Sequence, residues 1–421
     1  MKVALYTLGC KLNQAESQSL ANAFAHAGFK VVHPREEPDI YVVNTCTVTH
    51  IADRKSRHVL RSVRQKNPHA LVVATGCYAQ RDPQELIQLA DIVVGNEEKE
   101  QLVSLIQGLV QGRKQLGNEE KHRFTPFASD GRVRSLIKIQ DGCYGACTYC
   151  IVPKVRPREY SLPVSQIIET IKQSVALGYK EVVLTGTKVG SYKDSAVGLT
   201  ELVQYILDNT GVERLRLSSL QPGDLSPQLL RLWQDERLCR HFHLALQSGS
   251  QSVLQRMMRG YSLDEYCRAI DLIREAVAGA AITTDIMVGF PGESEHEFEE
   301  SYSFCERAGF ANIHVFPFSP RPGTIAAGMP SQIDEKVKKT RSQRMLQLAQ
   351  RSRRLYCDKF LGQTLPVLWE RETKLGSNVY SGLTTNYIRV YARSKTALTN
   401  KVIPAKLTAF HGQEMWGEIV I

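Results

Sequence analysis

The segment Cys143-Tyr144-Gly145-Ala146-Cys147-Thr148-Tyr149-Cys150 follows a run that is typical of a β-strand, Ser135 to Gln140. The three thiols of this loop triad (Cys143, Cys147 and Cys150) are spaced so that they can converge on one metal centre. A structural zinc site needs four protein ligands, and no other Cys or His lies between His122 and Cys239 to supply a fourth locally. Clustered thiolates also hold iron–sulfur clusters, and three ligands on a four-iron cluster leave one iron open to a substrate or cofactor. The loop triad therefore favours an iron–sulfur site over a zinc knuckle.

Strand-like and helix-like segments alternate from Ser135 to about Ser319. Each predicted strand is separated from the next by a segment with helical periodicity. Six β/α units with a metal loop after the first strand indicate an open, partial (β/α)6 barrel with its active site at the C-terminal ends of the strands. The predicted strands are Ser135 to Gln140, Glu181 to Thr185, Arg214 to Ser219, His241 to Leu246, Ala281 to Val288 and Asn312 to Phe318.

Glycine and polar residues recur at the ends of these predicted strands. Glycine lets a ligand approach the backbone closely, and hydroxyl, amide and carboxylate groups can hydrogen-bond the ligand's polar atoms. For any one glycine a turn is the competing interpretation, so the shared position at one barrel mouth carries the argument. The predicted cofactor contacts are Tyr149, Gly186, Thr187, Ser219, Gln247, Gly249 and Asp285.

Three further cysteines occupy equivalent positions in the first hundred residues. Val3 to Leu8, Ile40 to Asn44 and Leu71 to Thr75 are apolar, β-branched runs typical of a buried parallel sheet, and a helix-like segment follows each. The cysteines after these strands, the strand-end triad, are Cys10, Cys46 and Cys77. Because parallel strands end at one edge of their sheet, we expect the three thiols to lie together. Unrelated core cysteines would be the competing interpretation, but they would be scattered over strands and helices.

The C-terminal part of the chain changes character twice. Asp334 to Phe360 is predicted to form one long, basic helix, whose predicted buried side consists of Val337, Met345, Leu348, Ala349 and Tyr356. From Gly362 to Ile421, short alternating strands and turns predict a small β-barrel. Its strands mix aromatic and basic residues, which suits base stacking and phosphate contact on RNA, although strand tyrosines also serve in packing. These residues are Tyr380, Tyr387, Arg389, Tyr391, Arg393 and Lys395.

Composition narrows the class of protein. A chain of 421 residues with 43% hydrophobic and 23% charged residues predicts several folded domains. The formal net charge of +10 suits a polyanionic partner. We recognise no signal peptide and no apolar run that could span a bilayer, and therefore expect a cytoplasmic protein without a membrane partner, whose ten cysteines are mainly metal ligands. Motifs for nucleotide hydrolysis, dinucleotide binding or zincin chemistry are missing from the sequence.

The motifs together resemble a known enzyme family. Cys143-x-x-x-Cys147-x-x-Cys150 matches the signature of radical S-adenosylmethionine (SAM) enzymes. With the strand-end triad, the half-barrel and a terminal TRAM-like module, the chain resembles the methylthiotransferases from end to end. Leu8 to Asn13, Asn44 to Thr49 and Thr75 to Gln80 are most similar to the MtaB branch, which acts on N6-threonylcarbamoyladenosine in tRNA, next to the anticodon.

The resemblance implies two 4Fe-4S clusters and SAM as cofactors. The loop triad would hold the cluster that binds SAM and cleaves it reductively, and the strand-end triad would hold an auxiliary cluster that carries the sulfur for delivery. A methylthio group would then replace the C2 hydrogen of the modified adenine, with a second SAM supplying the methyl group. The implied partners are the anticodon stem-loop of tRNA and an electron-donor protein such as a flavodoxin or ferredoxin; the sulfur donor is not indicated.

The resemblance also implies an order of domains. We predict an N-terminal methylthiotransferase domain at 1–112, a linker at 113–132, a radical SAM partial barrel at 133–330, a basic connecting helix at 331–361 and a TRAM-like RNA-binding barrel at 362–421.

Several different functions are compatible with these motifs. Methylthiolation of isopentenyl-adenosine in tRNA, or of a ribosomal protein, would use the same chemistry on a different substrate. A noncatalytic iron–sulfur protein that binds RNA would need the clusters but no cofactor-lined barrel mouth. A radical SAM RNA enzyme of another kind would use its second cluster only to transfer electrons, and would make no methylthio product.

Overall fold

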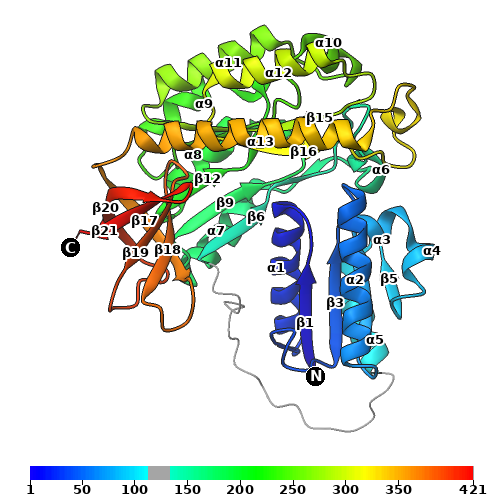
Figure 1. Ribbon diagram of the computed structural model, residues 1–421. Coiled ribbons are helices and arrows are strands. Elements are labelled where there is room, and N and C mark those ends of the chain that lie inside the picture. Colours follow the sequence, from blue (N-terminus) through cyan, green and yellow to red (C-terminus); the bar gives the residue numbers. More distant parts are fainter. Residues whose placement is uncertain (112–132, 421) are drawn as a thin grey trace. The chain divides into compact units, whose positions relative to one another are not determined.

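The computed structural model describes residues 1–111 and 133–420 (Figure 1). Its described residues form two compact units. The first unit contains residues 1–111, 141–145 and 150–159, and the second contains 133–140, 146–149 and 160–420. The linker predicted at 113–132 lies outside the described residues, and the predicted domain boundaries remain predictions.

The first unit is built on a parallel sheet with strand order β2-β1-β3-β4-β5. All six residues of β3 are buried, as expected for a central strand covered on both faces. One hydrophobic cluster joins the sheet to Leu60 and Val63 of α2, and a second joins it to Leu20 and Phe24 of α1. The strands are β1 (Lys2–Thr7), β2 (Lys30–Val31), β3 (Ile40–Thr45), β4 (Leu71–Gly76) and β5 (Ile92–Val94). The α-helices before residue 112 are α1 (Lys11–His26), α2 (His50–Lys66), α3 (Cys77–Arg81), α4 (Pro83–Leu86) and α5 (Leu102–Gln111), and α6 (Val152–Val155) also belongs to this unit.

The second unit contains the predicted half-barrel, in which every neighbouring pair of strands is parallel. The strand predicted from Arg214 to Ser219 is divided into two, because the chain changes from pairing with β9 to pairing with β14 at this point. The resulting segments have the orders β6-β9-β12 and β13-β14-β15-β16. Their bounds are β6 (Arg134–Lys138), β9 (Glu181–Thr185), β12 (Arg214–Leu217), β13 (Ser219–Leu220), β14 (His241–Leu244), β15 (Ala281–Val288) and β16 (Asn312–Pro317).

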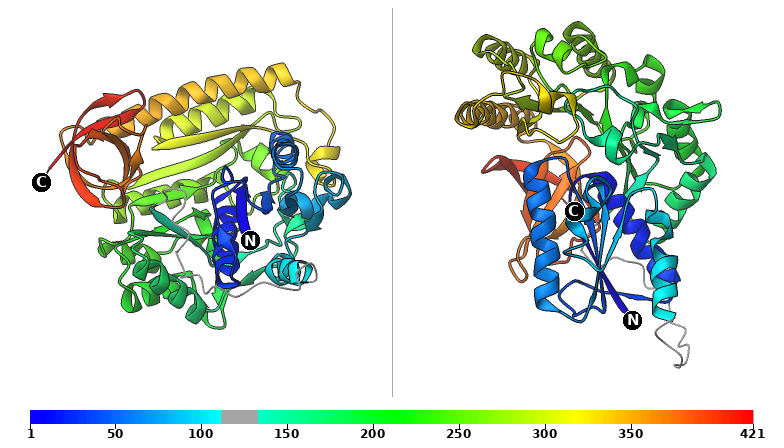
Figure 2. Two further views of the ribbon diagram at one scale, coloured as in Figure 1. Left: turned by 90° about the horizontal axis from the view of Figure 1, so that it is seen from below. Right: turned by 90° about the vertical axis from the view of Figure 1, so that its right-hand side faces the viewer.

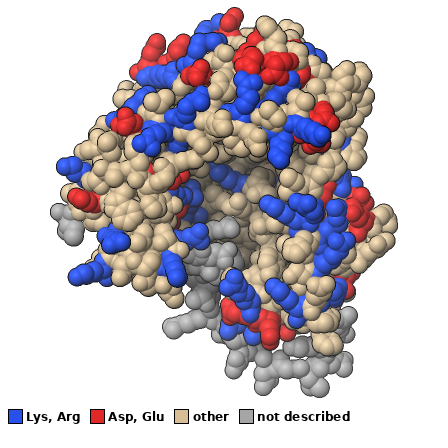
Figure 3. Space-filling model, in the orientation of Figure 1, with Lys and Arg blue, Asp and Glu red and all other residues tan. Residues whose placement is uncertain are grey.

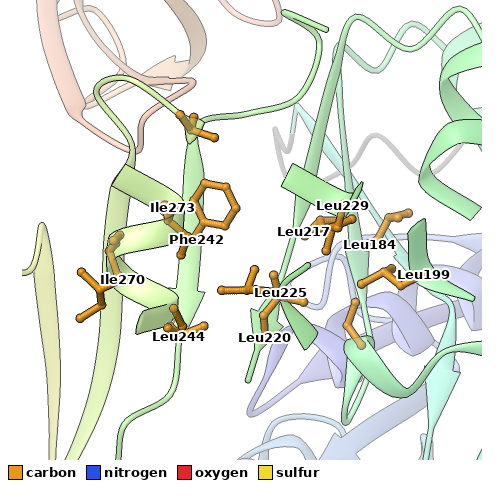
Figure 4. Packing of buried hydrophobic residues seen from close by; sticks show 14 of the residues in the cluster. Leu184, Leu199, Leu217, Leu220, Leu225, Leu229, Phe242, Leu244, Ile270 and Ile273 are labelled. Atoms are coloured by element: carbon orange, nitrogen blue, oxygen red, sulfur yellow. The ribbon is translucent and has the colours of Figure 1, made fainter. Parts of the chain in front are cut away.

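Helices cover the outer face of these strands and form a single apolar core with them. Figure 4 shows Phe242 and Leu244 of β14 beside Ile270 and Ile273 of α11, as expected for alternate residues of a strand that face a helix layer. The helical segment between β13 and β14 is short, because α9 ends at Arg231 and a 3-10 turn follows. The covering helices are α7 (Val164–Ala176), α8 (Leu199–Asn209), α9 (Pro227–Arg231), α10 (Gln251–Arg256), α11 (Leu263–Ala276) and α12 (Glu295–Ala308).

The long basic helix is α13 (Glu335–Asp358), and it packs along β16 and α12. The prediction that Val337 lies on its buried side is wrong, because 39% of this side chain is exposed. Arg341 and Arg353 are buried instead, and each forms an ion pair of 2.8 Å, with Glu293 and Glu414 respectively. Part of the positive charge of α13 therefore holds the unit together and is not available to a ligand.

The C-terminal module is the predicted small barrel, closed in the order β17-β18-β19-β21-β20 (Figure 2). Its core contains Trp369, which is fully buried. Tyr387 does not present its ring for base stacking as predicted. The ring stacks on His241 of the half-barrel with centroids 3.9 Å apart, and the guanidinium of Arg216 also lies over it. The strands are β17 (Thr364–Glu372), β18 (Val379–Thr384), β19 (Arg389–Arg393), β20 (Val402–His411) and β21 (Glu414–Ile419).

Within residues 1–111 and 133–420, no helix combines the length and the apolar character that a bilayer crossing requires.

Candidate cluster sites and the barrel mouth

The strand-end triad lies at one edge of the first unit's sheet. Cys10 is the N-cap of α1, Cys46 follows β3, and Cys77 is the first residue of α3 after β4. Because β1, β3 and β4 are neighbours, their C-terminal ends place the three residues side by side. Loss of hydration raises the pKa of the Cys10 thiol, and the nearby Cys77 raises it further. Burial likewise raises the pKa of Cys46 to about 12, with smaller contributions from Cys77 and Cys10.

Two glycines with left-handed backbones make this close approach possible. Gly9 has a φ of +96°, and a Cβ on it would lie 2.8 Å from Sγ of Cys46. Gly76 has a φ of +98°, and a Cβ on it would lie 2.4 Å from Oδ1 of Asn44. Any other residue at either position would be strained and would displace a neighbour. The glycines before Cys10 and Cys77 are therefore needed to bring the cysteine loops together.

Asparagine side chains fix the same loops. Nδ2 of Asn13 donates hydrogen bonds of 2.9 Å to the carbonyl oxygens of Leu8 and Thr45, next to the first two cysteines. Nδ2 of Asn96 donates to Sγ of Cys77 at 3.5 Å, while its Oδ1 is buried without a hydrogen-bond partner among the described residues. Three neighbouring thiols with amide donors beside them are a donor set that fits a 4Fe-4S cluster.

A buried ion cluster connects this edge to the segments on either side of the loop triad. Arg156, which follows the loop triad, pairs at 2.7 Å with both Glu16 of α1 and Asp141, which precedes the loop triad. Lys99 pairs with Glu16 at 2.5 Å. The four side chains carry two positive and two negative charges, and each is at most 10% exposed. The ion cluster therefore ties the segments that flank the loop triad to the helix that begins at Cys10.

The loop triad occupies the connection between β7 (Gln140–Asp141) and α6. In the first unit, the backbone N–H of Gly145 donates to Sγ of Cys143 at 3.2 Å, and that of Tyr144 donates to Glu159 at 2.9 Å. Gly142 has a φ of +73°, and a Cβ on it would lie 2.0 Å from the carbonyl oxygen of Arg158. The backbone around Cys143 is thus held against residues 158–159.

Cys147 and Thr148 belong to the second unit, where Arg259 is a neighbour that the sequence analysis missed. The Arg259 guanidinium donates to Sγ of Cys147 at 3.2 Å and to the hydroxyl of Tyr261 at 3.1 Å. Thr148 is fixed by a backbone hydrogen bond of 3.1 Å to the carbonyl of Met257. The only sequence signal was a basic residue after α10, which is too common a feature to single out.

Some of the predicted cofactor contacts lie at the ends of the half-barrel strands, and others pack against protein. Gly186 and Thr187 follow β9, and Ser219 lies in β13, at the mouth of the half-barrel. Gln247 and Asp285 come together, because the N–H of Gln247 donates to the Asp285 carbonyl at 2.8 Å. The remaining two predicted contacts, which pack against protein, are Tyr149 and Gly249.

Packing accounts for Gly249 without a ligand. A Cβ on Gly249 would lie 2.7 Å from Cβ of Phe304 and 2.8 Å from Cα of Ser301, both in α12. Tyr149 packs on an apolar cluster that includes Met257 and Phe290. Both assignments as cofactor contacts remain predictions, and the glycine has a sufficient structural reason of its own.

A polar group in the half-barrel was only partly recognised from the sequence. Nε2 of His243 lies 3.2 Å from Asp285, and His314 completes a set whose ligand-type atoms are within 4.8 Å of one another. Nδ1 of His243 contacts the hydroxyl of Thr283 at 3.0 Å. Because both ring nitrogens of His243 have protein partners, these contacts account for the position of the ring without a metal. Alternation along β14 and β16 was the signal that could have identified these histidines.

Two family models match parts of this chain. Residues 137–305 match the model of the Radical SAM superfamily, and residues 2–95 match Uncharacterized protein family UPF0004. A protein of Aquifex aeolicus named threonylcarbamoyladenosine tRNA methylthiotransferase MtaB is 38% identical over 401 residues, which cover 93% of this chain and 96% of the relative. The chain belongs to the radical SAM methylthiotransferase family. A protein of the same name from Bacillus subtilis is 35% identical and covers 96% of this chain and 93% of its own length.

A second named activity occurs among the relatives of this methylthiotransferase. A protein of Syntrophotalea carbinolica named tRNA-2-methylthio-N(6)-dimethylallyladenosine synthase is 33% identical over 433 residues, 99% of each chain. Among solved structures, the radical SAM methyltransferase TsrM from Kitasatospora setae, with cobalamin and a 4Fe-4S cluster bound, has a TM-score of 0.57 at 15% identity and covers 77% of both chains. That likeness shows the fold alone. Membership in the family makes this chain an enzyme, a transferase that uses SAM and two 4Fe-4S clusters.

Arg156→Gln is expected to lower the free energy of unfolding of this methylthiotransferase by about 3–5 kcal/mol, because Glu16 and Asp141 would keep buried charges without their shared partner. Urea denaturation followed by circular dichroism measures the loss. A matched control is Arg57→Gln, since Arg57 forms a partly exposed pair of 2.9 Å with Glu85 and should cost about 0–1 kcal/mol. Equal, small losses in the two variants would contradict a structural role for the ion cluster.

Proposed function

We propose that this enzyme replaces the C2 hydrogen of N6-threonylcarbamoyladenosine in tRNA, next to the anticodon, with a methylthio group. The observation that carries the proposal is the strand-end triad: three neighbouring thiols at a sheet edge, in addition to the loop triad of a radical SAM barrel. Named relatives at 38% and 35% identity act, by their names, on threonylcarbamoyladenosine in tRNA. This substrate also places the reaction in the cytoplasm.

The two triads have separate roles in the proposal. The loop triad holds the cluster at which SAM binds, with Arg259 beside Cys147 and the barrel-mouth residues around the cofactor. The strand-end triad holds the auxiliary cluster, whose loops Asn13 and Asn96 keep in place. When bound, the clusters and SAM supply the radical and sulfur chemistry that an unactivated C2–H bond requires and that side chains lack. The protein binds and orients these groups and the base. A flavodoxin or ferredoxin supplies the electrons.

The exposed cations of the C-terminal module support the proposal that this enzyme binds tRNA. Tyr391 is half-buried, while Arg393, Lys395, Lys401 and Lys406 are exposed on the barrel strands and loops. The exposed cations offer phosphate contacts. Because bound phosphates release counterions, the affinity for tRNA decreases steeply as salt concentration rises.

The test is nucleoside mass spectrometry of tRNA from cells that lack their own enzyme of this kind, with and without this gene. The expected result is 2-methylthio-N6-threonylcarbamoyladenosine only where the gene is expressed. If the expressed protein carries its iron–sulfur clusters and no methylthio nucleoside appears, the proposal is overturned. A catalytically dead variant, Cys147→Ala, controls for effects of expression alone.

A second candidate substrate is the dimethylallyl (isopentenyl) adenosine of tRNA. It is favoured by one observation, the 33% identity over 99% of both chains to the relative whose name carries that substrate. The same measurement separates the two, because the methylthio products differ in mass. If methylthiolated isopentenyl-adenosine appeared in place of the threonylcarbamoyl product, the proposed reaction would stand and the proposed substrate would be wrong.

A further inference from the structure

Helix α2 carries a concentration of positive charge that the sequence analysis did not use. Six of its seventeen residues are Lys or Arg, and its one acidic residue, Asp53, is buried. The Asp53 carboxylate is taken up inside the protein, where it pairs with Arg81 at 2.8 Å and accepts a hydrogen bond of 2.6 Å from Thr47. It therefore does not neutralise the outer face of the helix.

Two of the six cations are used structurally, and four are not. Arg57 pairs with Glu85 at 2.9 Å, and Arg64 pairs with Asp91 at 2.6 Å. The remaining cations have no ion pair or side-chain hydrogen bond within residues 1–111 and 133–420, and all of them are exposed. They are Arg54, Lys55, Arg61 and Lys66.

The free cations share one side of the helix. At 100° per residue, these four residues, together with the exposed His58 and Gln65, fall within an arc of about 140°, and Arg54 to Lys66 span about 18 Å along the axis. Figure 3 shows Lys and Arg side chains gathered over this helix. A surface of this length and charge can contact several successive phosphates of one nucleic-acid strand.

The start of the helix lies close in the chain to the strand-end triad. α2 begins four residues after Cys46, and the exposed apolar side chains Val48 and Ile51, at 50% and 52%, lie at this end. Beyond Ile51 the exposed face is entirely polar, so it lacks the apolar, aromatic centre typical of a protein–protein interface. RNA is a polyanion and needs no such apolar centre, so it suits this surface better than an acidic electron-donor protein does.

We propose that the outer face of α2 is an RNA-binding surface of this enzyme, which contacts the phosphate backbone of the tRNA whose base is modified. The inference rests on the proposed function, because that function brings RNA to the edge of the sheet at which α2 begins. Phosphates bind along Arg54, Lys55 and Arg61, while the apolar end at Ile51 faces the bases.

The test compares tRNA binding by cluster-reconstituted wild type, the triple variant Arg54→Gln/Lys55→Gln/Arg61→Gln and a matched control. The control, Lys172→Gln/Arg231→Gln/Arg268→Gln, removes three exposed cations from α7, α9 and α11. The α2 variant should bind tRNA roughly tenfold or more weakly, and the slope of log affinity against log salt should decrease by about two to three. The control should change neither quantity. Iron content and circular dichroism show that both variants are folded and loaded.

The outcomes separate this inference from the proposed function. If the wild type binds tRNA with a steep salt dependence and the α2 variant binds equally well, the α2 surface is overturned and the function stands. If the wild type itself does not bind tRNA, both are overturned. If tRNA binding is unchanged but flavodoxin-driven SAM cleavage falls relative to cleavage driven by dithionite, α2 binds the electron donor instead.

Discussion

Replacing Cys46 by Ala is expected to abolish methylthiolation of tRNA while leaving SAM cleavage to 5′-deoxyadenosine intact. Cys46 is buried at the sheet edge beside Gly9. The loop triad keeps its three cysteines in this variant, so the SAM-binding centre remains. The reaction is measured by nucleoside mass spectrometry and by chromatography of 5′-deoxyadenosine in the same samples.

The control for this variant is Cys267→Ala, because Cys267 is an exposed cysteine on α11 outside both triads. It should retain both activities. If Cys46→Ala still made the methylthio product at the rate of the control, the strand-end triad could not carry the transferred sulfur. If it lost SAM cleavage as well, the two triads would not have separable roles.

Replacing Cys147 by Ala has a different expected result: both SAM cleavage and methylthiolation should disappear. Cys147 is the loop-triad thiol that the Arg259 guanidinium contacts at 3.2 Å, and its removal leaves two thiols in the loop. Two ligands do not complete the set that a site-differentiated four-iron cluster needs. The measurement is the yield of 5′-deoxyadenosine per enzyme with dithionite as reductant.

Cys147→Ala should still fold and keep the auxiliary cluster. Its iron content should match that of Cys46→Ala, although the two variants differ in SAM cleavage. Cleavage of SAM at the wild-type rate by Cys147→Ala would show that the loop triad is not the SAM centre.

Buried, repetitive features of the fold could be predicted from the sequence. The strands β3, β4 and β9 are largely apolar runs, and β9, β15 and the start of β3 lie where the pattern indicated. The placement of Cys10, Cys46 and Cys77 followed from the same rule, since residues after neighbouring parallel strands share one edge. These predictions needed only local periodicity and strand order.

Features that depend on distant partners could not be predicted in this way. Arg341 and Arg353 appear in the sequence as part of a solvated basic helix, but their carboxylate partners Glu293 and Glu414 lie 48 and 61 positions away. Tyr387 appeared suited to stacking on a base, and its actual partner is His241. The sequence shows which side chains carry a charge or an aromatic ring. It does not show which distant residue pairs with that charge or stacks on that ring.

The ion cluster around Arg156 shows the same limit at the candidate site. Glu16 and Arg156 are 140 positions apart, and neither belongs to a recognisable ligand motif. Periodicity marked Glu16 only as a residue of a helix. The contribution of Arg156 to the arrangement of the two cysteine loops became visible only from the distances in the structure.

The presence of two separate cluster sites is tested most directly by the cluster content of three anaerobically reconstituted proteins. This content is measured by iron and sulfide analysis together with Mössbauer spectroscopy. The wild type should contain two 4Fe-4S clusters, and the variants Cys10→Ala/Cys46→Ala/Cys77→Ala and Cys143→Ala/Cys147→Ala/Cys150→Ala should each contain one. Equal cluster content in the wild type and the first triple variant would contradict the claim that the strand-end triad builds a cluster of its own.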